Sequence, residues 1–277
     1  KLTFPVSGSA AFNGTSDYVE LNTLNDYSGY TGLTFSAWMY SGDLTDNKTI
    51  ASNWGDNANN NFGWLIFTGQ FVDYRVSWLV SDDGTGYNRL DNGTNLNENQ
   101  WYYVTCVWES GSAKIYIDGS LDGSDTGGVP TSIYGTDFPT IIGADFDGPS
   151  ETPFRTFNGN LANVAIWNRA LSSDEINSVM WKTYEQVSTT ESNGLQAWYK
   201  LSADEVLSGT STATLTTYAN ANSLTFEAPA CVQTALNGLP DITDARLYSA
   251  NYDIRVKADG GNVESLNCVE TELNAIL

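Results

Sequence analysis

Residues 101–120 read WYYVTCVWESGSAKIYIDGS, and this stretch decides which class of fold the chain adopts. Aromatic and β-branched residues dominate Trp101–Trp108, which predicts a strand there, and Ala113–Ile117 is expected to form a second strand. Asp118-Gly119 follows directly and supplies the positive φ angles that a tight hairpin turn requires. The stretch therefore predicts antiparallel strands joined by short turns.

The same pattern of strand-like runs and turn residues extends from this hairpin through the first 170 residues. Short apolar or alternating runs are separated by clusters of Gly, Asn and Asp, as in an antiparallel sandwich. Further strands are expected at residues 18–21, 33–40, 64–67, 72–80, 140–142 and 161–167. We expect the strands to form two layers around one core, in which Trp38, Trp101 and Ile166 meet.

Alternation within the strand expected at 72–80 separates inward from outward side chains. Tyr74 and Trp78 fall on one face together with three valines, and both are therefore expected in the core. Arg75 falls on the opposite face, where it meets either ordinary solvent or a polar ligand.

One short helix is expected after the last strand of this region. Ser172 or Ser173 is suited to cap it, and Asp174 and Glu175 lie in its first turn, where acids favour a helix. Apolar residues follow at helical spacing from Ile176 onward, so the helix closes the first part of the chain.

A domain boundary is expected within the polar stretch 187–193. Residues 1–186 then form the sandwich, and residues 187–277 either complete it or form a small attachment domain. In this second part, strands are expected at 195–201, 245–248 and 252–256, and a helix at 263–277.

Acidic residues far outnumber basic ones. The sequence has 33 Asp and Glu against 12 Lys and Arg, for a formal charge of −21 at pH 7. Such a charge repels phosphate backbones and anionic membranes, so nucleic acid is not an expected partner. No apolar run approaches the ~18 residues of a membrane span, and membrane insertion is not expected. The acids form either a solvated surface or oxygen ligands for Ca²⁺.

The cysteines do not suggest a disulfide framework, because there are only three of them. Cys106 lies in an apolar strand and is expected to be a buried free thiol, whereas Cys231 and Cys268 either bridge the C-terminal segment or stay reduced. The chain starts at Lys1 with no signal-peptide pattern, which suggests a processed chain and leaves export open.

Four blocks in order resemble the laminin G-like domains of the concanavalin A-like lectin and glucanase superfamily. They are Phe12–Leu21, Leu33–Met39, Asn99–Val104 with Lys114–Gly119, and Phe157–Ser172. The resemblance implies an antiparallel jelly-roll β-sandwich, so the expected fold class is all-β, with one short helix and a smaller C-terminal α+β segment. Arg169, after the closing strand, is suited to hold a loop by hydrogen bonds.

Enzymes share this sandwich with lectins and adhesion modules, so activity must be inferred from the site. The sequence contains no histidine, which removes the usual general base and most zinc sites. Glucanases that resemble this chain carry two carboxylates ~5 Å apart on one strand, and no strand here has that pattern. Asp174-Glu175 at a helix start and Glu270-Thr271-Glu272 in the tail come nearest. The chain is therefore expected not to be an enzyme.

Acidic loops offer oxygen ligands for Ca²⁺. The candidate loops are residues 43–47, 82–83 and 145–151. The third loop resembles the place where laminin G-like domains often hold a cation, so Asp145, Asp147 and Glu151 are the expected ligands. Asn163 stands where many relatives carry an acid, which weakens any site that needs that charge. A solvated loop without metal is the alternative.

A carbohydrate site needs an exposed aromatic ring to stack on C–H groups and planar polar groups to bind hydroxyls. The loop at 53–61, which reads NWGDNANNN, supplies both. The candidate carbohydrate-binding residues are Trp54, Asp56, Asn60, Arg75 and Tyr87. In the alternative interpretation the loop is an ordinary turn, and Trp54 is tucked against the sandwich.

Two functions are consistent with these features. The first is a non-enzymatic module that binds a glycan or polysaccharide and is displayed on a cell or particle surface. The second is a structural or decoration protein of a virion, fibre or extracellular filament, in which the C-terminal segment mediates a homo-oligomer or larger assembly. Both functions predict an extracellular, cell-surface or virion-surface location.

Overall fold

The structure is a computed structural model. It describes residues 8–21, 24–45, 47–55, 61–69, 72, 74–136, 138–147, 152–202, 214–217, 242–248 and 253–258. The chain forms two compact units, one made of Val6–Thr217 and the other of Lys1–Pro5 with Tyr218–Leu277.

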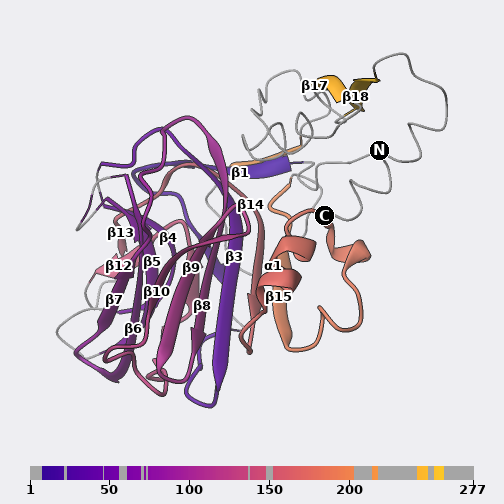
Figure 1. Cartoon of the computed structure of the whole chain (residues 1–277). Helices are drawn as coiled ribbons and strands as arrows, with labels where there is room; N and C mark the ends of the chain where they lie inside the picture. The colour runs from indigo at the N-terminus through magenta and orange to yellow at the C-terminus, as the bar shows by residue number, and fades with distance from the viewer. Residues whose placement is uncertain are drawn as a thin grey trace. The chain divides into compact units, whose positions relative to one another are not determined.

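The larger unit is a sandwich of two antiparallel sheets, visible as two layers of strands in Figure 1. One sheet has eight strands in the order β10-β9-β8-β3-β14-β1-β16, with β15 also paired to β14. Its strands are β1 (Gly8–Asn13), β3 (Gly32–Ser41), β8 (Trp101–Glu109), β9 (Ser112–Ile117), β10 (Ser120–Asp125), β14 (Asn158–Trp167), β15 (Leu195–Tyr199) and β16 (Thr214–Thr217).

The other layer is a six-stranded sheet in the order β2-β11-β4-β5-β6-β7. Its strands are β2 (Val19–Leu21), β4 (Lys48–Trp54), β5 (Phe62–Thr68), β6 (Val76–Gly84), β7 (Asn88–Asp91) and β11 (Thr140–Ile142). A two-stranded hairpin of β12 (Asp145–Asp147) and β13 (Thr152–Phe154) follows β11 along the chain. The predicted all-β antiparallel sandwich is confirmed.

The main core lies between the two sheets and is built from alternate residues of their strands. Phe35 from β3, Trp64 from β5 and Trp78 from β6 are buried there, with Trp64 5.8 Å from Trp78 and 6.0 Å from Phe35 between ring centroids. Cys106 is a buried free thiol of the same core, as predicted, and burial raises the pKa of this thiol. Cys231 and Cys268 lie outside the described residues.

The hairpin expected at Asp118-Gly119 is confirmed. Both residues have positive φ angles, 50° and 77°, and Ile117 pairs with Ser120 across the turn. Tyr103 donates its backbone N–H to Asp118 Oδ1 at 2.8 Å, which ties the turn to β8. Burial raises the pKa of the Asp118 carboxyl to about 6.

The strand expected at 72–80 is wrong in its first half, because β6 begins only at Val76. Tyr74 has a φ of 64° and is 38% exposed, so it belongs to a turn and not to the core. Trp78 is in the core as predicted. Arg75 precedes the strand and donates from Nε to Asn95 Oδ1 at 3.0 Å.

The expected meeting of Trp38, Trp101 and Ile166 in one core is also wrong. Only Ile166 belongs to the core between the sheets. Trp38 and Trp101 are buried on the outer face of the eight-stranded sheet, because the alternating neighbours of Trp38 in β3 take the inward positions. A large buried side chain in a strand therefore does not identify the inner face when both faces are covered.

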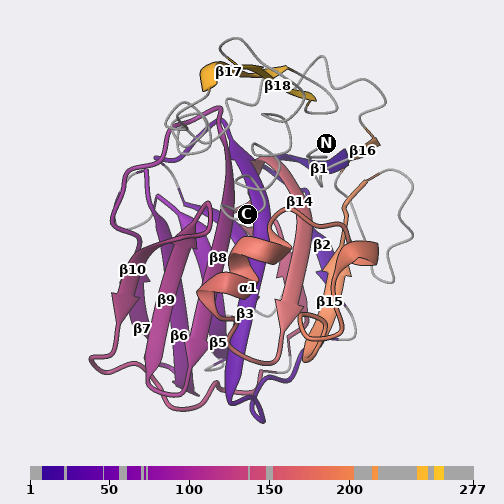
Figure 2. The ribbon, with the colours of Figure 1, turned by 45° about the vertical axis from the view of Figure 1, so that its right-hand side comes forward.

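The chain itself covers the outer face on which Trp38 lies. The helix α1 (Ser173–Val179) crosses this face in front of the strands in Figure 2, and Trp38 Nε1 donates to the carbonyl of Met180 at 3.3 Å. The predicted helix is confirmed, and its N-terminus is a capping box in which Ser172 and Glu175 exchange hydrogen bonds. Asn177 Nδ2 donates to the carbonyl of Gly119 and joins the helix to the hairpin turn.

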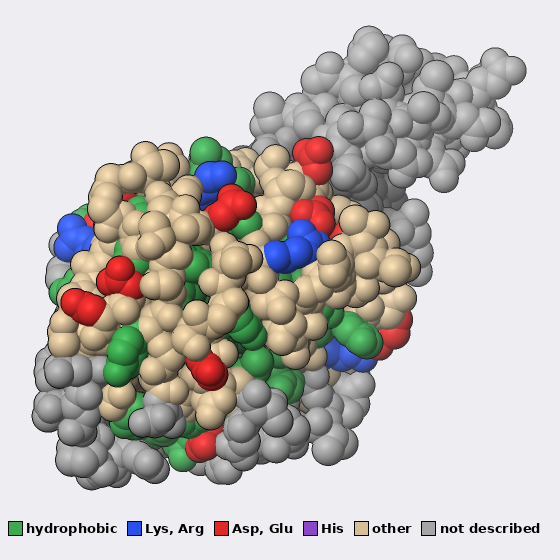
Figure 3. Space-filling model, turned by 90° about the horizontal axis from the view of Figure 1, so that it is seen from below, with side chains coloured by type: hydrophobic (Ala, Val, Ile, Leu, Met, Phe, Trp, Pro, Cys, Tyr) green, Lys and Arg blue, Asp and Glu red, His purple; other side chains and the backbone are tan. Residues whose placement is uncertain are grey.

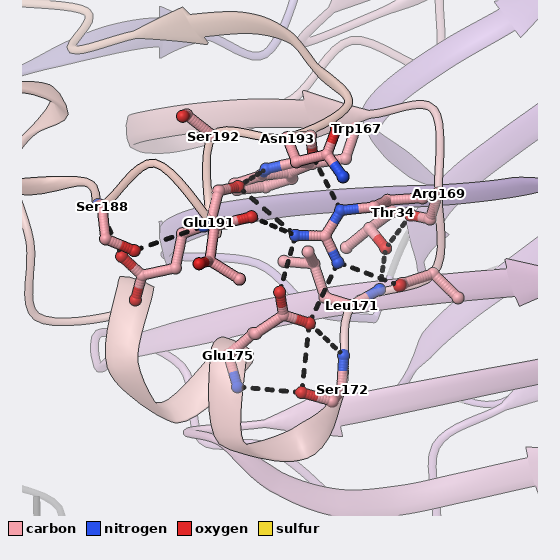
Figure 4. Close-up of polar contacts among 12 residues, drawn as sticks. Thr34, Trp167, Arg169, Leu171, Ser172, Glu175, Ser188, Glu191, Ser192 and Asn193 are labelled. Atoms are coloured by element: carbon pink, nitrogen blue, oxygen red, sulfur yellow. Dashed lines mark hydrogen bonds and ion pairs between the residues drawn. The ribbon is translucent and has the colours of Figure 1, made fainter.

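Arg169 holds the chain after the helix, as its position had predicted (Figure 4). Its guanidinium pairs with Glu175 at 2.6 Å and donates to the carbonyls of Asn193 at 2.6 Å and Thr190 at 3.1 Å. The stretch 187–193, where a domain boundary was expected, is thus fixed to the sandwich.

Beyond that stretch the chain adds two further strands to the eight-stranded sheet. β15 pairs with β14, with Ile166 opposite Ala197, and β16 pairs with β1, with Gly8 opposite Thr217. The larger unit therefore extends to Thr217, well beyond the expected boundary. In the smaller unit the two expected strands form the hairpin β17 (Ile242–Tyr248) and β18 (Asp253–Ala258). The helix expected at 263–277 lies outside the described residues.

Candidate functional site

The outer face of the six-stranded sheet carries a second apolar cluster. Trp64 and Ile66 of β5 point into the main core, so Leu65 and Phe67 point outward. The register places Leu65 opposite Leu79 of β6. The cluster on this face consists of Trp54, Phe62, Leu65, Phe67 and Leu79, and all five side chains are buried. We call it the outer cluster.

One end of the outer cluster reaches the surface through Tyr87. Trp54 and Phe62 are stacked with ring centroids 4.1 Å apart and planes at 11°. The edge of Trp54 contacts Tyr87, whose ring centroid is 5.8 Å away. Trp54 is only 6% exposed, whereas Tyr87 is 47% exposed. Tyr87 thus presents an aromatic ring to solvent on a rigid aromatic support.

Polar side chains flank Tyr87 in the sequence, although Asn88 lies opposite Val80 of the main core and so points away from the outer face on which Tyr87 packs. Asn88 follows Tyr87 and donates from Nδ2 to Asp125 Oδ2 at 3.1 Å, which connects β7 to β10. Asp83 precedes the ring, and its Oδ1 accepts backbone N–H bonds from Thr85 at 2.8 Å and Gly86 at 2.7 Å. We call Trp54, Phe62, Asp83, Tyr87, Asn88 and Asp125 the Tyr87 site.

Both carboxylates of the Tyr87 site favour the ionised state. The backbone N–H bonds from Thr85 and Gly86 lower the pKa of Asp83. The backbone N–H of Gly127 and the amide of Asn88 lower the pKa of Asp125 in the same way. The Tyr87 site therefore holds two ionised carboxylates, and Arg89, opposite Leu79 of the outer cluster, adds a base on the same face as Tyr87.

The other end of the outer cluster is closed by an ion pair. Arg155, directly after β13, binds the Asp145 carboxylate with its guanidinium, which also lies 5.8 Å from the Phe67 ring centroid. Thr49 of β4 donates its hydroxyl to Asp145 Oδ1 at 3.3 Å. Burial raises the pKa of Asp145, and the Arg155 charge opposes this by favouring the ionised carboxylate.

The expected calcium site can be tested only at one of its three ligands. Asp145 is buried, and a guanidinium and a hydroxyl already occupy its oxygens, so it does not fit the role of an open Ca²⁺ ligand. The side chain of Asp147 and the whole of Glu151 lie outside the described residues. Within the described ranges no three His, Cys, Asp or Glu side chains are grouped to hold a metal ion. Calcium binding stays a prediction.

The structure brings two of the expected carbohydrate-binding residues together. Trp54 and Tyr87 are in contact, although Trp54 supports the exposed ring and is itself tucked against the sandwich. Arg75 lies at the opposite end of β6, and a strand of nine residues spans about 30 Å. Asp56 and Asn60 lie outside the described residues.

Sequence reasoning did not propose the other members of the Tyr87 site for carbohydrate binding, although residues 82–83 were named as a candidate calcium loop. Phe62, Asp83, Asn88 and Asp125 come from β5, β6, β7 and β10, and only strand pairing brings them together. The one local signal was the turn sequence Asp83-Gly84-Thr85-Gly86, which marks a tight connection immediately before an aromatic residue.

The acids that came nearest to a catalytic pair have a structural role here. Glu175 accepts from the Arg169 guanidinium and from the Ser172 backbone, and these bonds lower its pKa. Glu270 and Glu272 lie outside the described residues. None of the helices that the structure describes is long and apolar enough to cross a membrane.

The chain belongs to the laminin G family of the concanavalin A-like lectin and glucanase superfamily, whose sequence model matches residues 13–177. Curated relatives include the "Sushi, von Willebrand factor type A, EGF and pentraxin domain-containing protein 1" of Rattus norvegicus, 26% identical over 161 residues. The same protein of Mus musculus is 25% identical over 162 residues. The matched region is 56% of this chain and only 4% of the length of each relative.

Solved structures with the same fold include a native heptameric SAP-like pentraxin from Limulus polyphemus. It has a TM-score of 0.51 and 15% identity, over 75% of this chain and 92% of the pentraxin. A putative carbohydrate binding protein from Bacteroides ovatus has a TM-score of 0.53 and 17% identity, over 81% of this chain and 61% of that protein. At these identities the similarity establishes the sandwich fold.

Proposed function

We propose that the chain is a non-enzymatic carbohydrate-binding module, displayed outside a cell or on a particle, with Tyr87 as its main contact to the sugar. The exposed Tyr87 ring, backed by the Trp54–Phe62 stack, is the observation that carries the proposal. Such a ring stacks on the C–H groups of a pyranose, and Asp83 in the preceding turn and Arg89 on the same face supply planar groups for its hydroxyls.

Family membership and the solved neighbours support this proposal without deciding the ligand. The superfamily includes lectins, and the Bacteroides ovatus neighbour is itself described as a putative carbohydrate binding protein. The whole sequence contains no histidine, and Asp174-Glu175 is engaged at a helix start, which supports a module without catalysis.

Replacing Tyr87 tests the proposal. Isothermal titration with the best-bound member of a panel of soluble polysaccharides should give about tenfold weaker binding for Tyr87→Ala than for the unchanged protein, because one stacking surface is lost. Tyr184→Ala is the matched control, since Tyr184 is similarly exposed at 54% but lies on η1 (Tyr184–Gln186), outside the Tyr87 site. Equal losses in both variants, or no binding across the panel, would remove the proposal.

Calcium dependence is tested in the same titration. We propose Ca²⁺ as the cation if the acidic loop of residues 145–151 holds one, and binding that is lost with a chelator and restored by added Ca²⁺ would support it. Binding that is unchanged by the chelator would show that the Tyr87 site works without a cation.

A structural role in a virion, fibre or filament is a second candidate. The separate compact unit of Tyr218–Leu277 with Lys1–Pro5 favours it, because a second unit can attach the sandwich to an assembly. Mass photometry of the full chain against a chain ending at Thr217 measures this. Assembly that depends on the second unit supports the role, and two identical monomers contradict it.

A further inference from the structure

Polar side chains continue from Tyr87 along β7, the terminal strand of the six-stranded sheet. Arg89 lies opposite Leu79 of the outer cluster, and Asp91 is two residues further on, so both point to the face on which Tyr87 packs. Ser77 donates its hydroxyl to Asp91 Oδ1 at 2.7 Å, and this bond holds the carboxylate on that face.

The same face extends to Arg75, just before β6. The backbone N–H of Gly69 donates to the carbonyl of Arg75 at 3.3 Å, so the pairing of β5 with β6 continues one residue before Val76. Arg75 is two residues before Ser77 and therefore shares its outward direction. The Asn95 amide accepts from Arg75 Nε at 3.0 Å and fixes the guanidinium. We call this set of side chains, Tyr87, Arg89, Asp91 and Arg75, the outer row.

The outer row is longer than one sugar ring. Alternate residues of a strand are ~6.8 Å apart, so Asp91 lies ~13 Å from Tyr87 along the strand. Because Asp91 is level with Ser77, Arg75 lies about 20 Å from Tyr87. A pyranose that stacks on Tyr87 can therefore reach Arg89, but only a longer chain reaches Arg75.

Among the residues that the structure describes, exposed turns flank the outer row at both ends. Residues 85–86 precede Tyr87, residues 93–95 adjoin Arg75, and all of these turn residues are exposed. A pocket that holds a chain end encloses it. A row with exposed turns at both ends instead suits a chain that passes through.

The middle of the outer row presents donors and acceptors together. Arg89 Nη2 lies 3.3 Å from Asp91 Oδ2, and 39% of the Arg89 side chain is exposed. A sugar hydroxyl both donates and accepts, so an adjoining guanidinium and carboxylate suit neighbouring hydroxyls. On the described part of the surface in Figure 3, basic side chains likewise lie next to acidic ones. The row therefore suits hydroxyl groups and does not select one sign of charge.

We infer that the outer row binds the interior of a polysaccharide chain, with several consecutive sugars lying along β7, an inference that rests on the proposed carbohydrate-binding function. One sugar stacks on Tyr87 and reaches Arg89. The following sugars place their hydroxyls on Asp91 and then on Arg75.

Oligosaccharides of increasing length, cut from the best-bound polysaccharide of the panel, test the inference. In isothermal titration the hexasaccharide should bind about tenfold more tightly than the disaccharide, because only the longer ligand gains the contacts at the far end of the row.

Variants at the far end of the outer row locate that gain. Arg75→Ala should weaken hexasaccharide binding about fivefold and leave the disaccharide unaffected, since the disaccharide is too short to reach Arg75. Asn95→Ala removes the amide that fixes Arg75 and should cause part of the same loss. Lys114→Ala is the matched control, because Lys114 is also a half-buried base on an outer face, but that of the eight-stranded sheet. Thermal unfolding confirms that each variant is folded.

The outcomes distinguish this inference from the proposed function. A gain with chain length that Arg75→Ala and Asn95→Ala reduce, and that Lys114→Ala keeps, supports the inference. A disaccharide that binds as tightly as the hexasaccharide, or a gain that both far-end variants retain, overturns it while the carbohydrate-binding function stands. A panel in which no polysaccharide binds overturns both.

Discussion

The two outer faces of the sandwich differ in how completely the chain covers them. On the eight-stranded sheet, α1 and the chain around Asn193 cover Trp38 and are fixed by Arg169. On the six-stranded sheet, the outer cluster is closed by Arg155 at one end and leaves Tyr87 exposed at the other. The first face is therefore fixed by the chain itself, whereas the second face leaves one aromatic ring exposed, which is where we propose that a ligand binds.

Trp38 should give the largest effect on stability. Trp38→Ala removes a side chain that is 2% exposed and leaves a cavity under α1, so the free energy of unfolding should fall by about 4 kcal/mol in urea denaturation. Polysaccharide binding by the folded fraction should not change, because Trp38 lies on the other face. If the folded Trp38→Ala protein lost polysaccharide binding, the two faces would not have separate roles.

Replacing Arg169 should have the second largest effect on stability. Arg169→Ala leaves Glu175 and the carbonyls of Thr190 and Asn193 without their donor, which should lower the free energy of unfolding by about 3 kcal/mol. Arg89→Ala is the control, because its exposed pair with Asp91 should contribute less than about 1 kcal/mol. Similar losses in the two variants would contradict a special role for Arg169.

A smaller effect on the free energy of unfolding is expected from protonation of Glu191, which lies in the chain that covers the eight-stranded sheet. Burial alone would raise the pKa of Glu191, but hydrogen bonds from Lys182, Ser178 and Ser188 lower it to about 2 from an ordinary 4.5. Because the folded-state pKa is the lower one, the ionised Glu191 stabilises the fold above about pH 4.5. This contribution, about 2 kcal/mol, is lost as the pH falls towards 2.

Glu191→Gln isolates that contribution. The variant should be less stable than the unchanged protein at neutral pH, and the difference should shrink in urea denaturation series that approach pH 2. A difference that stays constant with pH would show that Glu191 acts through its shape and not through its charge.

Local signals in the sequence were sufficient for most strands. The turn at Asp118-Gly119 and the capping box of Ser172 and Glu175 are encoded by neighbouring residues, so both were predicted correctly. The inner face was harder to identify, because Trp38 is buried by a helix that follows it by more than a hundred residues. β4 (Lys48–Trp54) was not predicted, since its polar Thr49, Ser52 and Asn53 find hydrogen-bond partners only in the fold.

The candidate site was also predictable only as far as its features depend on neighbouring residues in the sequence. Residue type alone made Trp54 and Tyr87 candidates for carbohydrate binding, because aromatic residues near turns rich in Asn suit that role. Their roles were not predictable, since the stacking of Trp54 on Phe62 depends on the pairing of β4 with β5. Asp125 joins the site from β10 only because that strand lies next to β7.

The pairing of β1 with β16 has a consequence for how the larger unit is made. Gly8 lies opposite Thr217, so the polypeptide enters and leaves this unit on adjacent strands. During synthesis the last strand cannot close the sheet until the ribosome has released Thr217, and this contact spans nearly the whole unit. Neighbouring entry and exit points also let such a unit be inserted into a loop of another protein with little strain.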